Sequence, residues 1–376
     1  MSNGYLNQKP IRVLQVVTTM NRGGLETMLM NYYRHIDRNK VQFDFLIHRE
    51  DTSDYENEII ALGGKIYRLS KLNPFSLRYR RNLTAFLKKH SEYKIIHVHQ
   101  DCLSSIALKA AYKVGIPVRI AHSHSASQDK NIKYLIKKIY KKSIPVYATH
   151  LFACGKDAGE WMFENNDFKI VRNAINSKSY IYNENIRSEV RKKLKIKDEE
   201  LVIGHVGRFN YPKNHRFLID IFREILNYKS NVKLLLVGTG ELEEKIKDKV
   251  SKLGINNQVI FMGKRNDVNN LMQAMDIFIF PSNYEGLPVT LIEAQAAGLP
   301  IVKSDHVSDQ CIISPNVYTV SLKDQPKDWA EKTISILGSF KRSDTSNYII
   351  NSHYDISTSV TWLENFYEEK FNEYKK

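Results

Sequence analysis

The chain has 376 residues, of which 42% are hydrophobic and 26% charged, and its formal net charge is +15. This length favours two domains, and the composition is that of an ordinary globular protein. No apolar run approaches the roughly 18 residues of a membrane span, and the polar stretch 1–10 lacks a signal-peptide core. The three cysteines, an odd number spread along the chain, indicate neither a disulfide framework nor a zinc site, so we expect a reducing cytoplasm.

Strand-like and helix-like segments alternate along the chain, which predicts an α/β fold with parallel sheets. In the first half we expect strands at 11–17, 43–48, 65–69, 95–99, 118–122, 150–153 and 169–172, with helices at 26–35, 83–90 and 103–113. The polar segment 177–200 has no strand pattern and is predicted to be a linker. A second series of strands follows at 201–207, 233–237, 258–262, 276–280 and 300–303.

Positive charge gathers in the stretch 131–142, which reads NIKYLIKKIYKK. An apolar stripe on one helical face is surrounded by five lysines. Such a helix either lies on an anionic membrane surface or packs on the core with solvated lysines, and both interpretations stay open. Nucleic acid is a third possibility, but the chain has no zinc-finger, homeodomain or RNP-type pattern, so we expect no nucleic-acid partner.

Several glycine-containing loops follow predicted strands. Gly23 and Gly24 open a helix after the first strand, where the backbone can approach an anion closely. Gly207 ends the first strand of the second half, and Arg208 and Lys213 follow it. A guanidinium and a lysine at a strand's carboxyl end suit a diphosphate, because open α/β sheets bind ligands there.

Two further loops, 238–241 and 263–265, follow the next strands, so Gly240, Lys264 and Arg265 should lie at the same sheet edge. Each loop is unremarkable alone. Together they predict one ligand site at the carboxyl edge of the second sheet.

The most informative stretch runs from Phe280 through Glu293. An apolar strand ends before Pro281, a short loop follows, and a helix begins with Pro288 near its first position. The free N–H groups of that helix start suit phosphate. Glu285 and Glu293 lie eight residues apart and could flank a ligand the size of a nucleotide sugar.

Histidines concentrate at strand ends in the first half, where a His-x-His pair appears twice: His97 with His99, and His122 with His124. Neither pair has Cys or carboxylate partners at metal-ligand spacing, so a hydrogen-bonding role ranks above zinc. The chain has no Asp-x-Asp, which a metal-bridged diphosphate would call for. We therefore expect no metal, with Arg208 and Lys213 supplying the positive charge.

These motifs resemble those of retaining GT-B-fold glycosyltransferases of family 4, the "group 1" type, and especially the branch that builds capsules and exopolysaccharides. The resemblance covers most of the chain and is strongest in the Glu-x7-Glu element. The residues that carry it are 20–31, 95–99, 120–124, 171–176, 206–208, 213–214, 281–285 and 293–300. One departure is Ala174, where the family often has glycine after Asn173; alanine disfavours a positive φ.

The resemblance implies a fold of two Rossmann-like domains that face each other across a cleft. We expect an acceptor-binding domain at 1–180, a nucleotide-sugar-binding domain at 181–355, and a final helix at 356–376 that returns to the N-terminal domain. The final helix should dock through an aromatic stripe on one face.

The resemblance also implies residue roles. His122, Arg208, Lys213 and Glu285 are the expected catalytic residues: His122 beside the anomeric centre, the two cations on the donor diphosphate and Glu285 on the sugar. Glu293 would hold the ribose and 263–265 would meet the base. The expected donor-binding set is Gly23, Gly24, Gly207, Gly240, Lys264, Arg265, Gly286, Leu287, Pro288, Val289 and Glu293.

The expected function is transfer of a sugar, a hexose or N-acetylhexosamine, from a nucleotide-diphosphate donor to a lipid-linked glycan in surface polysaccharide synthesis. The resemblance favours UDP by family frequency. The cysteines indicate a cytoplasmic enzyme, and the basic stretch 131–142 would allow peripheral contact with an anionic membrane. We expect no cofactor. A nucleotide-sugar epimerase or phosphorylase on the same fold is the alternative enzyme. A non-catalytic basic binding protein is the alternative from another class.

Overall fold

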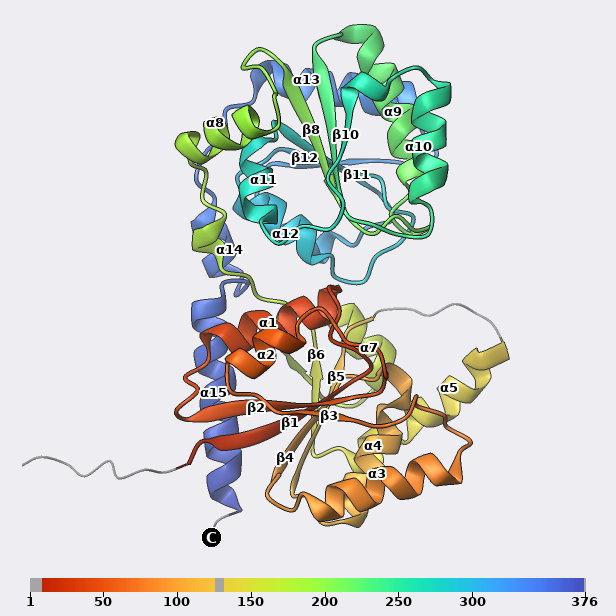
Figure 1. Cartoon of the computed structure of the whole chain (residues 1–376), viewed down its shortest axis with the longest axis vertical. Helices are drawn as coiled ribbons and strands as arrows, with labels where there is room; N and C mark the ends of the chain where they lie inside the picture. The colour runs from red at the N-terminus through yellow and green to blue at the C-terminus, as the bar shows by residue number, and fades with distance from the viewer. Residues whose placement is uncertain (1–8, 126–131, 375–376) are drawn as a thin grey trace, which may run out of the picture. The chain divides into compact units, whose positions relative to one another are not determined.

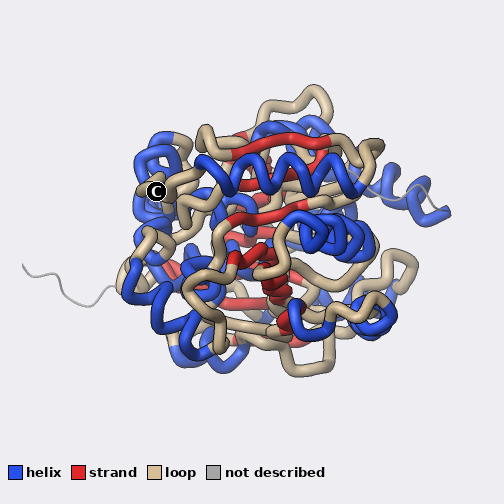
Figure 2. The backbone as a smooth tube through the Cα atoms, turned by 90° about the horizontal axis from the view of Figure 1, so that it is seen from above, coloured by secondary structure: helices blue, strands red, loops and turns tan. Residues whose placement is uncertain are grey.

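The computed structural model describes residues 9–125 and 132–374. The chain forms two compact units (Figure 1). Unit 1 combines Met1–Ala174 with Ile356–Lys376, and unit 2 is Ile175–Asp355. Each unit has a parallel sheet that is flanked by helices (Figure 2).

The sheet of unit 1 has seven parallel strands in the order β3-β2-β1-β4-β5-β6-β7. The strands are β1 (Ile11–Val17), β2 (Val41–Ile47), β3 (Ile66–Arg68), β4 (Ile95–Val98), β5 (Val118–Ser123), β6 (His150–Ala153) and β7 (Lys169–Ile170). The helices are α1 (Gly24–His35), α2 (Glu56–Ala61), α3 (Leu77–Lys89), α4 (Ser104–Lys113), α5 (Ile132–Lys142), α6 (Ile144–Tyr147), α7 (Lys156–Phe163) and α15 (Ile356–Glu373), with a 3-10 turn η1 (Asp101–Leu103).

The last helix, α15, belongs to unit 1 although it ends the chain. It contacts α1, β1 and β2, which come from the beginning of the chain (Figure 1). Val360, Leu363 and Tyr367 are buried in the same core cluster as Val13 and Phe43. Burial of this one face explains why its apolar residues recur at helical spacing.

Unit 2 has a six-stranded parallel sheet in the order β10-β9-β8-β11-β12-β13. The strands are β8 (Leu201–Val206), β9 (Val232–Val237), β10 (Val259–Phe261), β11 (Ile277–Phe280), β12 (Ile301–Ser304) and β13 (Val317–Val320). The helices are α8 (Glu184–Lys193), α9 (His215–Tyr228), α10 (Glu243–Lys252), α11 (Val268–Ala274), α12 (Val289–Ala296), α13 (Pro326–Ser339) and α14 (Ser346–Asn351), with 3-10 turns η2 (Ser177–Ser179), η3 (Asn256–Gln258) and η4 (Asp309–Cys311).

The predicted alternation of strands and helices is confirmed, and every predicted strand has a counterpart. In both sheets the central strands are buried on both faces, as parallel sheets require, and they read as continuous apolar runs. The sequence analysis missed β13, a short strand at the sheet edge whose residues are at most half-buried. Edge strands carry weak hydrophobic patterns, which accounts for the omission.

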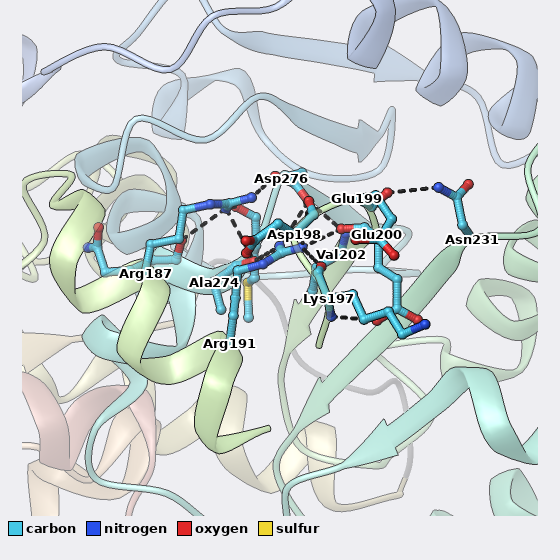
Figure 3. Close-up of polar contacts among 12 residues, drawn as sticks. Arg187, Arg191, Lys197, Asp198, Glu199, Glu200, Val202, Asn231, Ala274 and Asp276 are labelled. Atoms are coloured by element: carbon cyan, nitrogen blue, oxygen red, sulfur yellow. Dashed lines mark hydrogen bonds and ion pairs between the residues drawn. The ribbon is translucent and has the colours of Figure 1, made fainter. Parts of the chain in front are cut away.

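The polar segment 177–200 is not the simple linker that its composition predicts, because it contains α8 docked on unit 2. Figure 3 shows two arginines of α8 reaching the chain before β11. Arg187 Nη2 lies 2.7 Å from Asp276 Oδ1. Arg191 is 2% exposed and donates to the carbonyls of Ala274 at 3.0 Å and Lys197 at 2.6 Å. Guanidinium groups thus satisfy carbonyls that would otherwise be buried without donors.

Candidate functional site

The strand order of unit 2 reverses between β8 and β11, which are neighbours although β9 and β10 separate them in sequence. In doubly wound sheets such a switch point opens a crevice at the carboxyl ends of the strands, where ligands bind. The Lys213 loop follows β8, and the Glu285 loop follows β11. The predicted donor residues of these two loops therefore lie at the switch point.

Hydrogen bonds tie the two loops together. Asn283 donates from its backbone N–H to Pro212 O at 2.7 Å and from its side chain to Tyr211 O at 2.8 Å. Asn214 returns a bond from its side chain to Pro281 O at 3.1 Å. These three bonds fix the distance between the loops before any ligand binds, which is the preorganisation that binding sites need.

Lys213 and Glu285 form an ion pair inside this crevice, with Nζ 2.7 Å from Oε1. Their side chains are only 15% and 11% exposed, so water screens the pair weakly. Lys213 Nζ also lies 4.6 Å from the centre of the Phe280 ring, a favourable cation–π distance. The residue expected to bind the diphosphate and the residue expected to bind the sugar are thus an ion pair.

The glycine loops meet at the same edge. Gly207 N–H donates to Val237 O and Gly238 N–H to Gly263 O, both at 2.9 Å. A Cβ at Gly240 would lie 2.4 Å from Phe209 O, and one at Gly238 would lie 2.1 Å from Gly207 O. Glycine is needed at these two positions because backbone passes where a side chain would stand.

The other predicted cations of unit 2 are placed differently from Lys213. The Arg208 side chain is 69% exposed, with Nη2 3.1 Å from Glu241 Oε2. Arg265 makes two bonds to Asp267, at 2.8 and 2.7 Å, and is 39% exposed. Of Arg208 and Arg265, Arg208 has more freedom to reorient, because among the described residues one exposed carboxylate, Glu241, binds its side chain.

Glu293 lies in α12, which begins at Val289 directly after its N-cap Pro288. It is 8% exposed, and burial raises the pKa of its carboxyl group, opposed by the Tyr180 hydroxyl that donates to Oε1 at 2.8 Å. Sequence reasoning missed Tyr180, because 113 residues separate it from Glu293. Leu287 packs on the core cluster beneath this loop, while Gly286 is exposed.

In unit 1 the four histidines cluster at the ends of β4 and β5, where His97, His99 and His122 are buried and His124 is partly buried. His97 Nε2 lies 3.1 Å from His122 Nδ1, and His97 Nδ1 lies 2.7 Å from the Tyr367 hydroxyl. His99 Nδ1 lies 2.9 Å from His124 Nε2. Among the described residues, His122 Nε2 has no hydrogen-bond partner and its side chain is 2% exposed.

A metal ion is the other occupant that this cluster suggests. His97, His99 and His122 offer nitrogens within 4.8 Å of one another. Both ring nitrogens of His97 are, however, already in hydrogen bonds, as are those of His99 to His124 and Gln15. The geometry therefore fits a hydrogen-bonded network better than a set of metal ligands.

Gly23 is the N-cap of α1, and Gly24 is its first residue. A Cβ at Gly23 would lie 2.4 Å from Glu26 Oε2, so the glycine makes room for that carboxylate. Burial raises the pKa of Glu26 to about 7. Glu26 lies within the motif range 20–31, but the sequence analysis gave it no role. The turn at Asn173 and Ala174 avoids the positive φ that alanine disfavours, since neither residue adopts it.

Acid should destabilise the protein through these histidines. Burial lowers the pKa of His97, His99 and His122 well below the ordinary 6.5, and that of His124 to about 3. Below about pH 6.5 the unfolded chain binds more protons than the folded one, so each histidine costs about 1.4 kcal/mol of stability per pH unit. We expect the melting temperature to fall steeply from about pH 7 to about pH 5.

Circular dichroism melts across this range check the prediction. The exposed His35, replaced by glutamine, is the control and should leave the acid effect unchanged. A melting temperature that stays level down to about pH 5 would contradict the placement of neutral histidines in the core.

Two Rossmann-like units, the second with cations and carboxylates at its switch point, are the architecture of GT-B glycosyltransferases. The model of "Glycosyltransferase Family 4" matches residues 22–177 and that of "Glycosyl transferases group 1" matches 186–351. The chain belongs to this family of glycosyltransferases, family 4 or group 1.

Two curated relatives match nearly the whole length of the chain, and a third matches part of it. The putative glycosyltransferase EpsF of Bacillus subtilis (strain 168) is 34% identical over 96% of this chain and 97% of its own. The capsular polysaccharide biosynthesis glycosyltransferase CapH of Staphylococcus aureus is 25% identical over 96% and 99%. An Escherichia coli UDP-Gal:alpha-D-GlcNAc-diphosphoundecaprenol alpha-1,3-galactosyltransferase is 24% identical over 60% and 62%.

A solved structure supports the fold. HepE from Anabaena, crystallised with UDP and glucose, superposes with a TM-score of 0.78 at 16% identity, covering 95% of this chain and 99% of HepE. The prediction of a GT-B fold with two parallel-sheet units is confirmed. Within the described residues, no helix is both long enough and apolar enough to span a bilayer.

Proposed function

We propose that this glycosyltransferase moves a hexose or N-acetylhexosamine from a UDP-sugar to a lipid-linked glycan in surface polysaccharide synthesis, with retention of anomeric configuration. The observation that carries the proposal is the Lys213–Glu285 pair at the switch point of unit 2. CapH's name supports the polysaccharide role, UDP in HepE supports the donor, and the diphosphoundecaprenol acceptor of the E. coli relative supports the lipid link.

The proposed donor site assigns each residue a task. Lys213 and Arg208 bind the diphosphate and stabilise the negative charge that develops as the sugar leaves; such preorganised charge is usually the largest catalytic contribution. When the donor binds, the Glu285 carboxylate, which pairs with the Lys213 ammonium, also binds a sugar hydroxyl. The backbone from Gly286 to Val289, at the start of α12, approaches the phosphate. Glu293, held by Tyr180, binds the ribose.

The remaining assignments concern the base and unit 1. Lys264 and Arg265 follow β10 and meet the base, with Gly207 and Gly240 leaving room for the nucleotide. In unit 1, His122 offers an unpartnered Nε2 to the transferred sugar, and Gly23 and Gly24 contribute to donor binding from this unit. Charge from Lys213 and Arg208 takes the place that a bridging metal has in other transferases, so we propose catalysis without metal or cofactor.

We also propose a cytoplasmic enzyme that touches an anionic membrane through 131–142. Asn131 lies outside the described residues, and the helix begins at Ile132. On the described part of α5, Ile139 of the apolar stripe is 69% exposed. This exposure does not fit the alternative in which the stripe packs on the core. Lys141 is engaged with Glu164 at 3.0 Å, whereas Lys138 and Lys142 are exposed.

A screen of nucleotide sugars by thermal shift, followed by a transfer assay with the best ligand, tests the proposal. A true donor stabilises the folded state in proportion to the logarithm of its occupancy ratio. Transfer with retained configuration is the expected result, and a product of inverted configuration would contradict the proposed retention. Sugar interconversion without acceptor would indicate an epimerase, and a pyridoxal-phosphate absorption band would indicate a phosphorylase.

A further inference from the structure

A second basic pocket lies in unit 1, away from the sheet edge that carries the histidines. It is enclosed by α3, α4 and the α5–α6 corner, which lie side by side (Figure 1). Its polar lining includes Arg80, Ser105, Lys109, Lys113, Tyr140 and Ser143. The family motifs identified in the sequence contribute none of these residues.

Among the residues that the structure describes, three cations line this pocket and no carboxylate does. Lys109 and Lys113 stand one turn apart on α4, where like charges destabilise a helix. Within residues 9–125 and 132–374, neither lysine nor Arg80 forms an ion pair with an acidic side chain, and the Lys109 ammonium lies 5.3 Å from the centre of the Tyr147 ring. An uncompensated cluster of this kind is stabilised by an external anion.

A buried hydroxyl points to the same ligand. Ser105 is 2% exposed, and its Oγ has no hydrogen-bond partner among the described residues. Ser105, Lys109 and Lys113 are four residues apart in α4, so their side chains lie on the same face of the helix. A buried polar atom without a partner costs free energy, so an occupant of the pocket that accepts a hydrogen bond would relieve that cost.

The wall of the pocket opposite α4 is held in place by hydrogen bonds of Arg80. Arg80 donates to Pro74 O at 2.6 Å and to the Tyr140 hydroxyl at 2.7 Å, which holds the guanidinium at the rim. A planar guanidinium, two ammonium groups and hydroxyl donors match the three oxygens of a phosphate group better than a single carboxylate.

We propose that this pocket binds a phosphate group, carried by a free phosphate ester or by a lipid headgroup. The lipid source is included because large apolar side chains stand exposed on the same helices and the segment before α3. These are Phe75 (69% exposed), Leu77 (66%) and Ile139 (69%). The inference does not depend on the donor site of unit 2, and its test uses no nucleotide.

The experiment measures binding of the full-length chain to inorganic phosphate by titration, and to phosphatidylcholine vesicles with and without phosphatidic acid by sedimentation. The double variant Lys109→Gln/Lys113→Gln should weaken binding roughly thirtyfold, since each lysine contributes about fivefold near an anionic surface. Ser105→Ala should weaken it severalfold without lowering the melting temperature, because it removes a hydroxyl that has no partner in the protein.

The matched control is Lys88→Gln/Lys89→Gln, which removes the same charge from exposed positions at the end of α3, outside the pocket. Loss of binding in the pocket variants but not in the control supports the proposal. If inorganic phosphate binding is lost, the natural ligand is a free phosphate ester. If only binding to vesicles with phosphatidic acid is lost, the ligand is a lipid headgroup. Binding of neither probe, or equal losses in pocket and control variants, would overturn it.

Discussion

Lys213→Ala should reduce kcat/KM for sugar transfer about 100- to 1,000-fold, the usual loss when a preorganised charge at the developing anion is removed. Lys213 is the cation fixed in the crevice, with Nζ 2.7 Å from Glu285 Oε1. Its removal takes away the diphosphate contact and leaves Glu285 largely buried without a cation. We therefore expect a second, smaller effect, a loss of about 1–3 kcal/mol in the free energy of unfolding.

Two measurements separate these effects. Steady-state kinetics with the identified donor report the catalytic loss, and denaturant unfolding reports the loss of stability. The control is Arg216→Ala, which removes an exposed cation one turn further along the chain and should change neither quantity by much. Transfer by Lys213→Ala at the wild-type rate would contradict the diphosphate assignment.

Arg191→Ala should lower the free energy of unfolding by about 3–5 kcal/mol, because removing one partner of a buried charged network strands the others. Arg191 is 2% exposed and donates to Ala274 O at 3.0 Å and Lys197 O at 2.6 Å (Figure 3). It also lies 3.5 Å from Asp276 Oδ2. Truncation removes donors from the carbonyls and a counter-charge from the carboxylate.

The neighbouring Lys192, fully on the exposed side of α8, provides the control. Lys192→Ala should change stability by less than about 0.5 kcal/mol. Urea unfolding followed by tryptophan fluorescence measures both variants. If the two variants unfold at the same urea concentration, the network of Figure 3 does not anchor α8 to unit 2.

The sequence predicted that the Lys213 and Glu285 loops share one sheet edge, but it did not predict the contacts between them. Strand ends of a parallel sheet share one edge, so Lys213 and Glu285 could be placed at the same edge without knowing the strand order. Their direct pairing depends on β8 lying beside β11 and on the Asn283 and Asn214 hydrogen bonds. Neither the order nor these bonds leave a local pattern in the sequence.

Contacts between distant segments were missed for the same reason. Tyr180 meets Glu293 across 113 residues, and nothing in either local sequence indicates it. The linker prediction for 177–200 was wrong because composition treats arginine as a surface residue. Arg191 is buried, since backbone carbonyls accept hydrogen bonds from both of its terminal nitrogens, Nη1 and Nη2.

Isothermal titration of UDP into the full-length chain in the presence of EDTA tests the central claim most directly. Arg208 is 69% exposed and held by one contact to Glu241, so it is free to turn to a diphosphate. The account predicts that UDP binds without a metal and that Arg208→Ala weakens the affinity roughly tenfold or more, the value of a hydrogen bond to a charged group. No binding of UDP, or equal affinity in the variant, would contradict it.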